Sequence, residues 1–180
     1  GVRVYLTLNT LIYDRELRDY LAAAETAYLA GVDALIVADI GGAAALRRTF
    51  PDLPLHASTQ MSGHSVGCAK ELASLGFERM VLAREMSFAD IAGFTRTSPI
   101  EAEVFIHGAL CVCHSGQCLF SSMVGGRSGN RGECAQPCRL PYNGGKYPLS
   151  LKDNCLAGHI PELIDAHVTS LKIEGRMKGT

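Results

Sequence analysis

The sequence predicts an α/β protein built from parallel βα repeats, in the form of a partial barrel resembling a TIM barrel, with a cysteine-rich loop segment. Two patterns support this prediction. Up to about residue 106, short β-branched and apolar runs alternate with segments of helical periodicity, as in parallel sheets covered by helices. Almost every predicted strand is followed by a polar residue, and in a barrel such residues converge on one rim.

Six segments are predicted to be strands: 3–8, 34–38, 55–58, 80–83, 103–106 and 170–173. Six strands cannot close a barrel of eight, and an open parallel sheet leaves unpaired edges. We therefore expect the chain to be a fragment of a longer protein, or to associate with another copy of itself.

Helices are predicted between the strands. Asp14 is expected to cap the first helix, which ends near Ala30. Ser87, with Asp90 three residues later, marks another helix start. Two more helices are predicted, at residues 42–48 and 64–75.

The composition fits one domain or a large part of one, since 180 residues with 47% hydrophobic content can form a single core. Three parts are predicted: βα repeats over 1–106, an insert rich in Cys, Gly and Arg over 107–148, and a final helix and strand over 149–180. No apolar run is long enough for a membrane span and no signal peptide is visible, so the expected location is the cytoplasm.

Five cysteines set among glycines are candidate metal ligands: Cys111, Cys118, Cys134, Cys138 and Cys155. Without a secretory leader, this density predicts a soft-metal or iron–sulfur site rather than disulfides. A cluster needs about four thiolates converging from flexible loops. The spacing matches neither a zinc ribbon nor a ferredoxin, so zinc stays open as the alternative to iron. The other alternative is a set of buried, reduced thiols.

The insert is locally basic although the net charge of the chain is −1. Residues 107–146 contain one acid, Glu133, against four basic residues: Arg127, Arg131, Arg139 and Lys146. The three arginines predict a site for a phosphate or carboxylate. The alternative is that they are solvated surface residues.

Further candidates follow predicted strands. His107 suits a catalytic acid or base near neutral pH, or alternatively a histidine that orients a loop. Lys172 and Glu174 share one face of their strand, so they form either an ion pair or a substrate-binding pair. Gln60 and Arg176 also lie at strand ends and are candidate substrate-binding residues. No HExxH, GxSxG, GxxxxGK[ST] or GxGxxG motif is present.

The segments EVFIHGALCVCHSGQCLFSS, GGRSGNRGECAQPCRLPY and SLKIEGRMKG closely resemble peptidase family U32, whose members are often labelled collagenase-like proteases. The resemblance continues upstream through VYLTLNTLIYDREL, GVDALIVADIG, PLHASTQM and RMVLARE, so it covers essentially the whole chain. It implies a barrel-type βα fold with further strands before the point where this chain starts.

The resemblance implies two activities. The family label implies a peptidase of unknown catalytic type. Other relatives use a four-cysteine iron–sulfur cluster, expected to be 4Fe-4S, and support hydroxylation of transfer RNA, ribosomal RNA or the ubiquinone ring, with prephenate as a co-substrate in some. Carried over by motif, four of the five cysteines would be ligands: Cys111, Cys118, Cys134 and Cys155, with Cys138 in reserve.

Three hypotheses follow. The first is iron–sulfur-dependent hydroxylation of tRNA, rRNA or another aromatic substrate, with the basic loop receiving phosphate or the carboxylates of prephenate. The second is a peptidase that acts on proteins or peptides, with His107 and Glu174 as acid and base. The third is a non-catalytic scaffold with a structural metal site.

Overall fold

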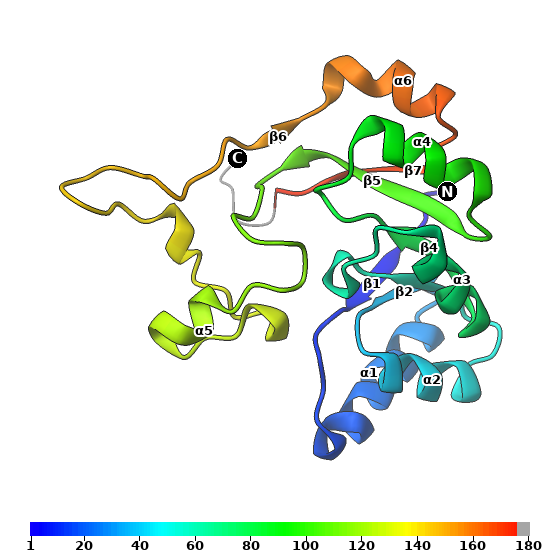
Figure 1. The fold of residues 1–180 in the computed structure, drawn as a ribbon. Coiled ribbons are helices and arrows are strands. Elements are labelled where there is room, and N and C mark those ends of the chain that lie inside the picture. The colour runs from blue at the N-terminus through cyan, green and yellow to red at the C-terminus, as the bar shows by residue number, and fades with distance from the viewer. Residues whose placement is uncertain (176–180) are drawn as a thin grey trace.

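The computed structural model describes residues 1–175, so Arg176 lies outside the described residues. A curved, mostly parallel sheet forms half of a barrel (Figure 1). Its strands are β1 (Tyr5–Leu8), β2 (Ala34–Val37), β3 (Leu55–Ala57), β4 (Phe77–Val81), β5 (Glu101–Gly108), β6 (Asn154–Cys155) and β7 (Ser170–Ile173). The first five pair in sequence order, β7 pairs parallel to β5, and β6 pairs antiparallel to the end of β5. The predicted fold class is therefore confirmed.

All six predicted strands are present, and β6 was not predicted. Two strands begin earlier than expected, β4 at Phe77 and β5 at Glu101. The first residues of these two strands include the charged residues Arg79 and Glu101, which lie outside the predicted strands. The two side chains satisfy each other across neighbouring strands, with Arg79 Nη2 lying 2.6 Å from Glu101 Oε2. This pairing allows charged residues to lie within a sheet.

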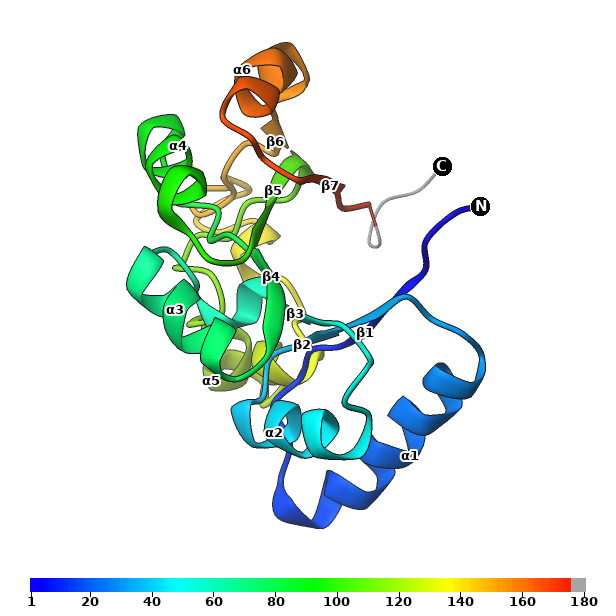
Figure 2. The ribbon, with the colours of Figure 1, turned by 90° about the vertical axis from the view of Figure 1, so that its right-hand side faces the viewer.

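The helices of the βα repeats cover one side of the sheet (Figure 2), whereas the helix of the insert packs against 3-10 turns of the insert. The helices are α1 (Leu17–Leu29), α2 (Ile40–Thr49), α3 (Val66–Ser74), α4 (Phe88–Thr97), α5 (Phe120–Gly125) and α6 (Ile160–Asp165). Short 3-10 turns occur at Asp14–Glu16, Thr59–Met61, Gly129–Arg131, Pro137–Arg139 and Ala157–His159. None of the helices in the described residues combines the length and the apolar character needed to cross a membrane.

The helix starts follow local hydrogen bonding. Ser87 and Asp90 form the predicted capping box of α4. The prediction that Asp14 caps the first helix was wrong. Tyr13 occupies the cap position, and the Glu16 carboxylate accepts its N–H at 2.8 Å, so a 3-10 turn containing Asp14 precedes α1.

The core lies between the helices and the sheet. Leu35, Leu55 and Met80 on the strands are almost fully buried against Leu46 and Leu163 on the helices. Residues that alternate with these point to the opposite face of the sheet, which is unusually polar. His56, Arg79 and Glu103 are each at most 6% exposed and line this face. The polar face leads to the carboxyl ends of the strands, where the candidate site lies.

Candidate functional site

A loop that contains the first cysteines leaves the sheet at the end of β5. At its start, Gly108 has a φ of +136°, and a Cβ there would come within 2.9 Å of the Glu174 carbonyl oxygen. Further along, Gly116 has a φ of +75° and packs so closely on the Gln60 carbonyl that a side chain has no room. Only glycine fits both positions, so the loop is held against the ends of β7 and β3. Gln60 thus has a backbone contact with this loop.

Arg84 and Glu85, which follow β4 after two more residues, anchor the same loop. The Arg84 N–H donates to Ser115 Oγ at 3.3 Å, and the Glu85 carboxylate accepts the Ser115 N–H at 2.5 Å and its hydroxyl at 3.2 Å. Ser62 Oγ donates to the Ser115 carbonyl at 2.5 Å. Ser115 is only 4% exposed, so its hydrogen bonds are shielded from water. They attach the loop to the rim of the sheet.

The thiols of Cys111 and Cys138 are both influenced by Cys118 and Cys134. The surrounding protein atoms raise the pKa of Cys111, Arg84 opposes this, and the thiols of Cys138, Cys118 and Cys134 raise it further. The pKa of Cys138 is also raised by its surroundings and by Cys134 and Cys118. All seven cysteines are free. Cys138 thus interacts electrostatically with the first three candidates, although these four side chains do not form a metal-binding group within the described residues.

Cys155, the fifth candidate, has a different position. It lies in β6, where it pairs with His107 of β5, and it is exposed. His107 is itself exposed, and its backbone carbonyl accepts the Glu174 N–H at 3.0 Å. Within residues 1–175 the imidazole of His107 makes no hydrogen bond, so the predicted acid or base projects from the rim without a partner.

Lys172 and Glu174 do not pair with each other. Lys172 Nζ donates to Glu103 Oε1 at 2.8 Å, deep on the polar face of the sheet. Glu174 Oε2 instead lies 2.5 Å from Arg84 Nη2 at the rim. The predicted ion pair between the two was wrong, because Lys172 pairs with Glu103 on β5 and Glu174 pairs with Arg84, which follows β4.

The three arginines of the insert are also separated. Arg131 forms a two-pronged pair with Glu16, at 2.7 and 3.0 Å, and lies over the Tyr13 ring. Arg139 donates to Asp153 and to three other oxygens, on Leu110, Ser150 and Leu151. Arg127 is exposed and donates only from Nε, to the Glu133 carbonyl, among the described residues. Arg127 is thus the one of the three whose outer nitrogens are available to a ligand.

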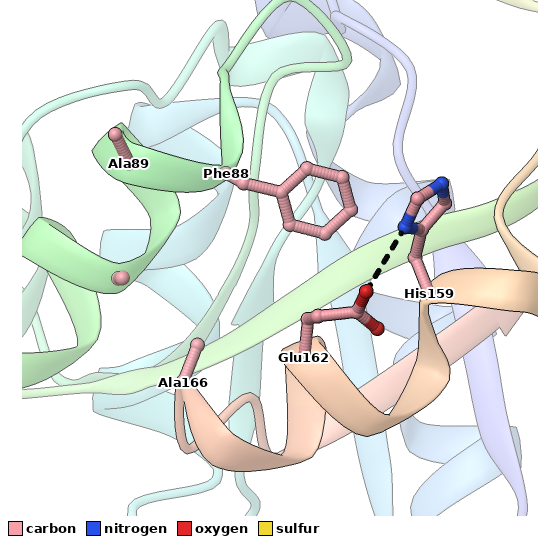
Figure 3. Close-up of a pocket in the computed structure, with 6 residues that line it drawn as sticks. Phe88, Ala89, His159, Glu162 and Ala166 are labelled. Atoms are coloured by element: carbon pink, nitrogen blue, oxygen red, sulfur yellow. Dashed lines mark hydrogen bonds and ion pairs between the residues drawn. The ribbon is translucent and has the colours of Figure 1, made fainter.

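Two cavities differ in their position relative to the site. The larger, about 330 Å³, lies between α4 and α6 and is lined by Phe88, Ala89, Ala92, His159, Glu162 and Ala166 (Figure 3). His159 and Glu162 pair with each other there at 3.3 Å. The smaller, about 160 Å³, borders Arg84, Phe105 and Asn154 and adjoins the candidate site.

Comparison with known families settles the relationship of the chain. The model of peptidase family U32 matches residues 1–180. The chain belongs to peptidase family U32. The resemblance predicted from the cysteine-containing segments is therefore confirmed over its full length.

Three relatives of this U32 chain illustrate the range of names in the family. It is 44% identical to a 23S rRNA 5-hydroxycytidine C2501 synthase of Escherichia coli, over 99% of the chain and 28% of that protein. It is 36% identical to tRNA hydroxylation protein P1 of Bacillus subtilis, over 99% of the chain and 46% of that protein. It is also 36% identical to an uncharacterized protease of Methanocaldococcus jannaschii, over 98% of the chain and 47% of that protein. The chain thus spans less than half the length of these relatives.

The thiols of the U32 chain agree in chemistry with a soft-metal centre. The insert carries four free thiols, and thiolates are the ligands that iron–sulfur clusters use. Across residues 1–175, no three His, Cys, Asp or Glu side chains are placed close enough together to share a metal ion. The residue types therefore suit such a centre, whereas the described side chains do not form a metal-binding group.

Arg84 and Glu85 are among the polar residues that follow predicted strands, but the sequence assigned them no specific role and did not point to Ser115. Nothing local indicates what Arg84 and Glu85 contact. Their partners, Glu174 and Ser115, are 90 and 30 residues away in sequence. Only the fold brings them together.

Proposed function

We propose that this chain provides the cysteine-rich part of an enzyme that hydroxylates a base of ribosomal or transfer RNA by means of an iron–sulfur cluster. The observation that carries the proposal is that four free cysteines, Cys111, Cys118, Cys134 and Cys138, lie in one insert at the rim of the half-barrel, in a chain of peptidase family U32. The names of the E. coli and B. subtilis relatives supply the substrate class. A bound cluster supplies one-electron redox chemistry.

The residues of the chain have separate roles in this proposal. Cys111, Cys118, Cys134 and Cys138 hold the cluster, and Cys155 is the remaining candidate for one of the four positions. Arg127 contacts an RNA phosphate through its outer nitrogens. His107 exchanges a proton at its exposed imidazole. We place the activity in the cytoplasm, where thiols stay reduced and RNA is available.

The first test is the iron and acid-labile sulfide content of protein purified without oxygen, with its absorption spectrum. We expect about four irons per chain, as a 4Fe-4S cluster requires. Replacing Cys111, Cys118 or Cys134 by Ser should abolish binding, while Cys113→Ser is the matched control from the same insert. Comparing Cys138→Ser with Cys155→Ser identifies the fourth ligand. Full iron content in all of these variants would contradict the proposal.

The second test concerns the substrate. Nucleosides of rRNA and tRNA from cells that lack the full-length protein are compared by mass spectrometry with those from cells complemented by the wild type or by Cys134→Ser. We expect one hydroxylated nucleoside to be lost and restored only by the wild type. Unchanged nucleosides in both RNA classes would contradict an RNA substrate. A requirement for prephenate or another small carboxylate stays a prediction, which the same assay tests by adding that compound.

A peptidase is the alternative function, and it is favoured by the family name and by the M. jannaschii relative. In this reading His107 and Glu174 are the acid and base. The Glu174 carboxylate is occupied by Arg84, which leaves His107 without a carboxylate partner among the described residues. Cleavage of denatured collagen or casein that survives Cys→Ser changes but not His107→Ala would support this alternative.

A further inference from the structure

Arg84 occupies a position that joins the cysteine loop to the sheet. Its side chain is 12% exposed, and its guanidinium carbon lies 4.0 Å from the centroid of the Phe105 ring. One outer nitrogen, Nη2, is held by Glu174 at 2.5 Å. The stacking and the ion pair together fix the plane of the guanidinium.

The other outer nitrogen of Arg84 points toward sulfur. Nη1 lies 3.9 Å from Cys111 Sγ, within hydrogen-bond range for a sulfur acceptor. The two neighbouring contacts, from the Arg84 N–H and the Glu85 carboxylate to Ser115, hold the same loop from its other end. The loop is therefore attached at two points. At Ser115 the contacts come from the Arg84 backbone and the Glu85 carboxylate, and at Cys111 the contact comes from the charged Arg84 side chain.

We infer that Arg84 is a positioning residue that donates a hydrogen bond to the Cys111 sulfur and adds a fixed positive charge beside the metal centre, with Glu174 orienting it. The part of this inference that concerns the cluster rests on the proposed function. Reduction potentials of iron–sulfur clusters depend on net charge and on hydrogen bonds to sulfur. A positive charge held at this distance stabilises the more negative, reduced state of a cluster and so raises its reduction potential.

The test compares four variants of the iron-loaded chain: Arg84→Gln, Arg84→Lys, Ser115→Ala and Lys146→Gln. Spectroscopic redox titration should show a more negative potential for Arg84→Gln and a smaller change for Arg84→Lys, which keeps the charge but loses the fork. Ser115→Ala removes the hydroxyl contacts of Ser115 with Arg84 and Glu85 and changes no charge, so its potential should stay near that of the wild type. Lys146→Gln removes an exposed charge of the same insert and should leave the potential unchanged. Equal shifts in Arg84→Gln and Ser115→Ala would overturn the inference, because they would indicate a purely structural effect.

A second readout does not depend on iron. Hydrogen exchange of the amides of residues 109–118 in metal-free protein should be faster in Arg84→Gln than in the wild type and unchanged in Lys146→Gln. If the wild type holds no iron, the proposed function fails while this measurement still tests the contact. Unchanged exchange in Arg84→Gln would refute the role of Arg84 in holding Cys111.

Discussion

Lys172 on β7 donates to the carboxylate of Glu103 on β5 at 2.8 Å, and the Glu103 side chain is only 5% exposed. Arg79 on β4 approaches the second oxygen of the same carboxylate at 3.4 Å. Burial disfavours the charged form of Glu103, but Lys172, with Ser170 and Arg79, outweighs it and lowers the pKa of Glu103. The polar face of the sheet is therefore held together by a charge network that joins three strands.

Removing Lys172 should destabilise the protein, because Glu103 is then left with Arg79 alone. Lys172→Met should lower the free energy of unfolding by about 1–3 kcal/mol, less than the full cost of breaking a buried pair since one cation remains. Urea unfolding at pH 7 measures this. The double variant Lys172→Met/Glu103→Gln should recover part of the loss, and a larger loss in the double variant would contradict the pairing.

Stability should fall with acid through His56. Burial, followed by the charge of Arg79, lowers the pKa of His56 to about 4 from its ordinary value of 6.5. The unfolded state therefore binds more protons between pH 6.5 and 4, so this contribution to stability is present above pH 6.5 and lost as the pH falls toward 4. The loss is of order 3 kcal/mol at most for a shift of this size. In His56→Gln, unfolding measured at pH 7 and pH 5 should show a smaller pH dependence; an equal dependence would refute the assignment.

A second acid-sensitive contact joins the insert to the first helix. Arg131 and the Tyr13 N–H lower the pKa of Glu16 to about 2 from 4.5. The contribution of this contact is present above pH 4.5 and lost as the pH falls to about 2. Glu16→Gln should therefore be less stable than the wild type at pH 7, and the difference should shrink below pH 4. Thermal unfolding across this range measures it, and a constant difference would contradict the prediction.

Gly116→Ala should detach the cysteine loop from the 3-10 turn beneath it. The positive φ and the close Gln60 carbonyl both oppose a side chain, and such strain costs about 1–3 kcal/mol. We expect faster hydrogen exchange at residues 109–118 and a lower iron content. Gly125→Ala is the matched control, because a Cβ there meets no atom within 4 Å. Equal behaviour of the two variants would contradict the docking of the loop.

Arg127→Gln should weaken RNA binding if Arg127 contacts a phosphate. The slope of log affinity against log salt should decrease by about 1, since one counterion-releasing contact is lost. Arg96→Gln removes an exposed arginine near the end of α4 and serves as the control. Filter binding to rRNA and tRNA fragments at several salt concentrations measures both slopes. An unchanged slope for Arg127→Gln would place the phosphate contact elsewhere.

The local features of this protein follow from its sequence alone. Alternation of apolar strands with helical segments predicted six strands and the α/β class, and Ser87 with Asp90 predicted the start of α4. These features depend on neighbours within a few residues, which the sequence displays directly. The family followed from the cysteine-containing segments for the same reason.

Only the tertiary structure decided which distant side chains meet. Lys172 and Glu174 are two residues apart, yet one pairs with Glu103 and the other with Arg84. The position of the cysteine loop likewise depends on how Ser115 and Gly116 dock against the sheet. Such contacts join residues that are tens of positions apart, so their partners are set by the path of the backbone in space rather than by sequence spacing.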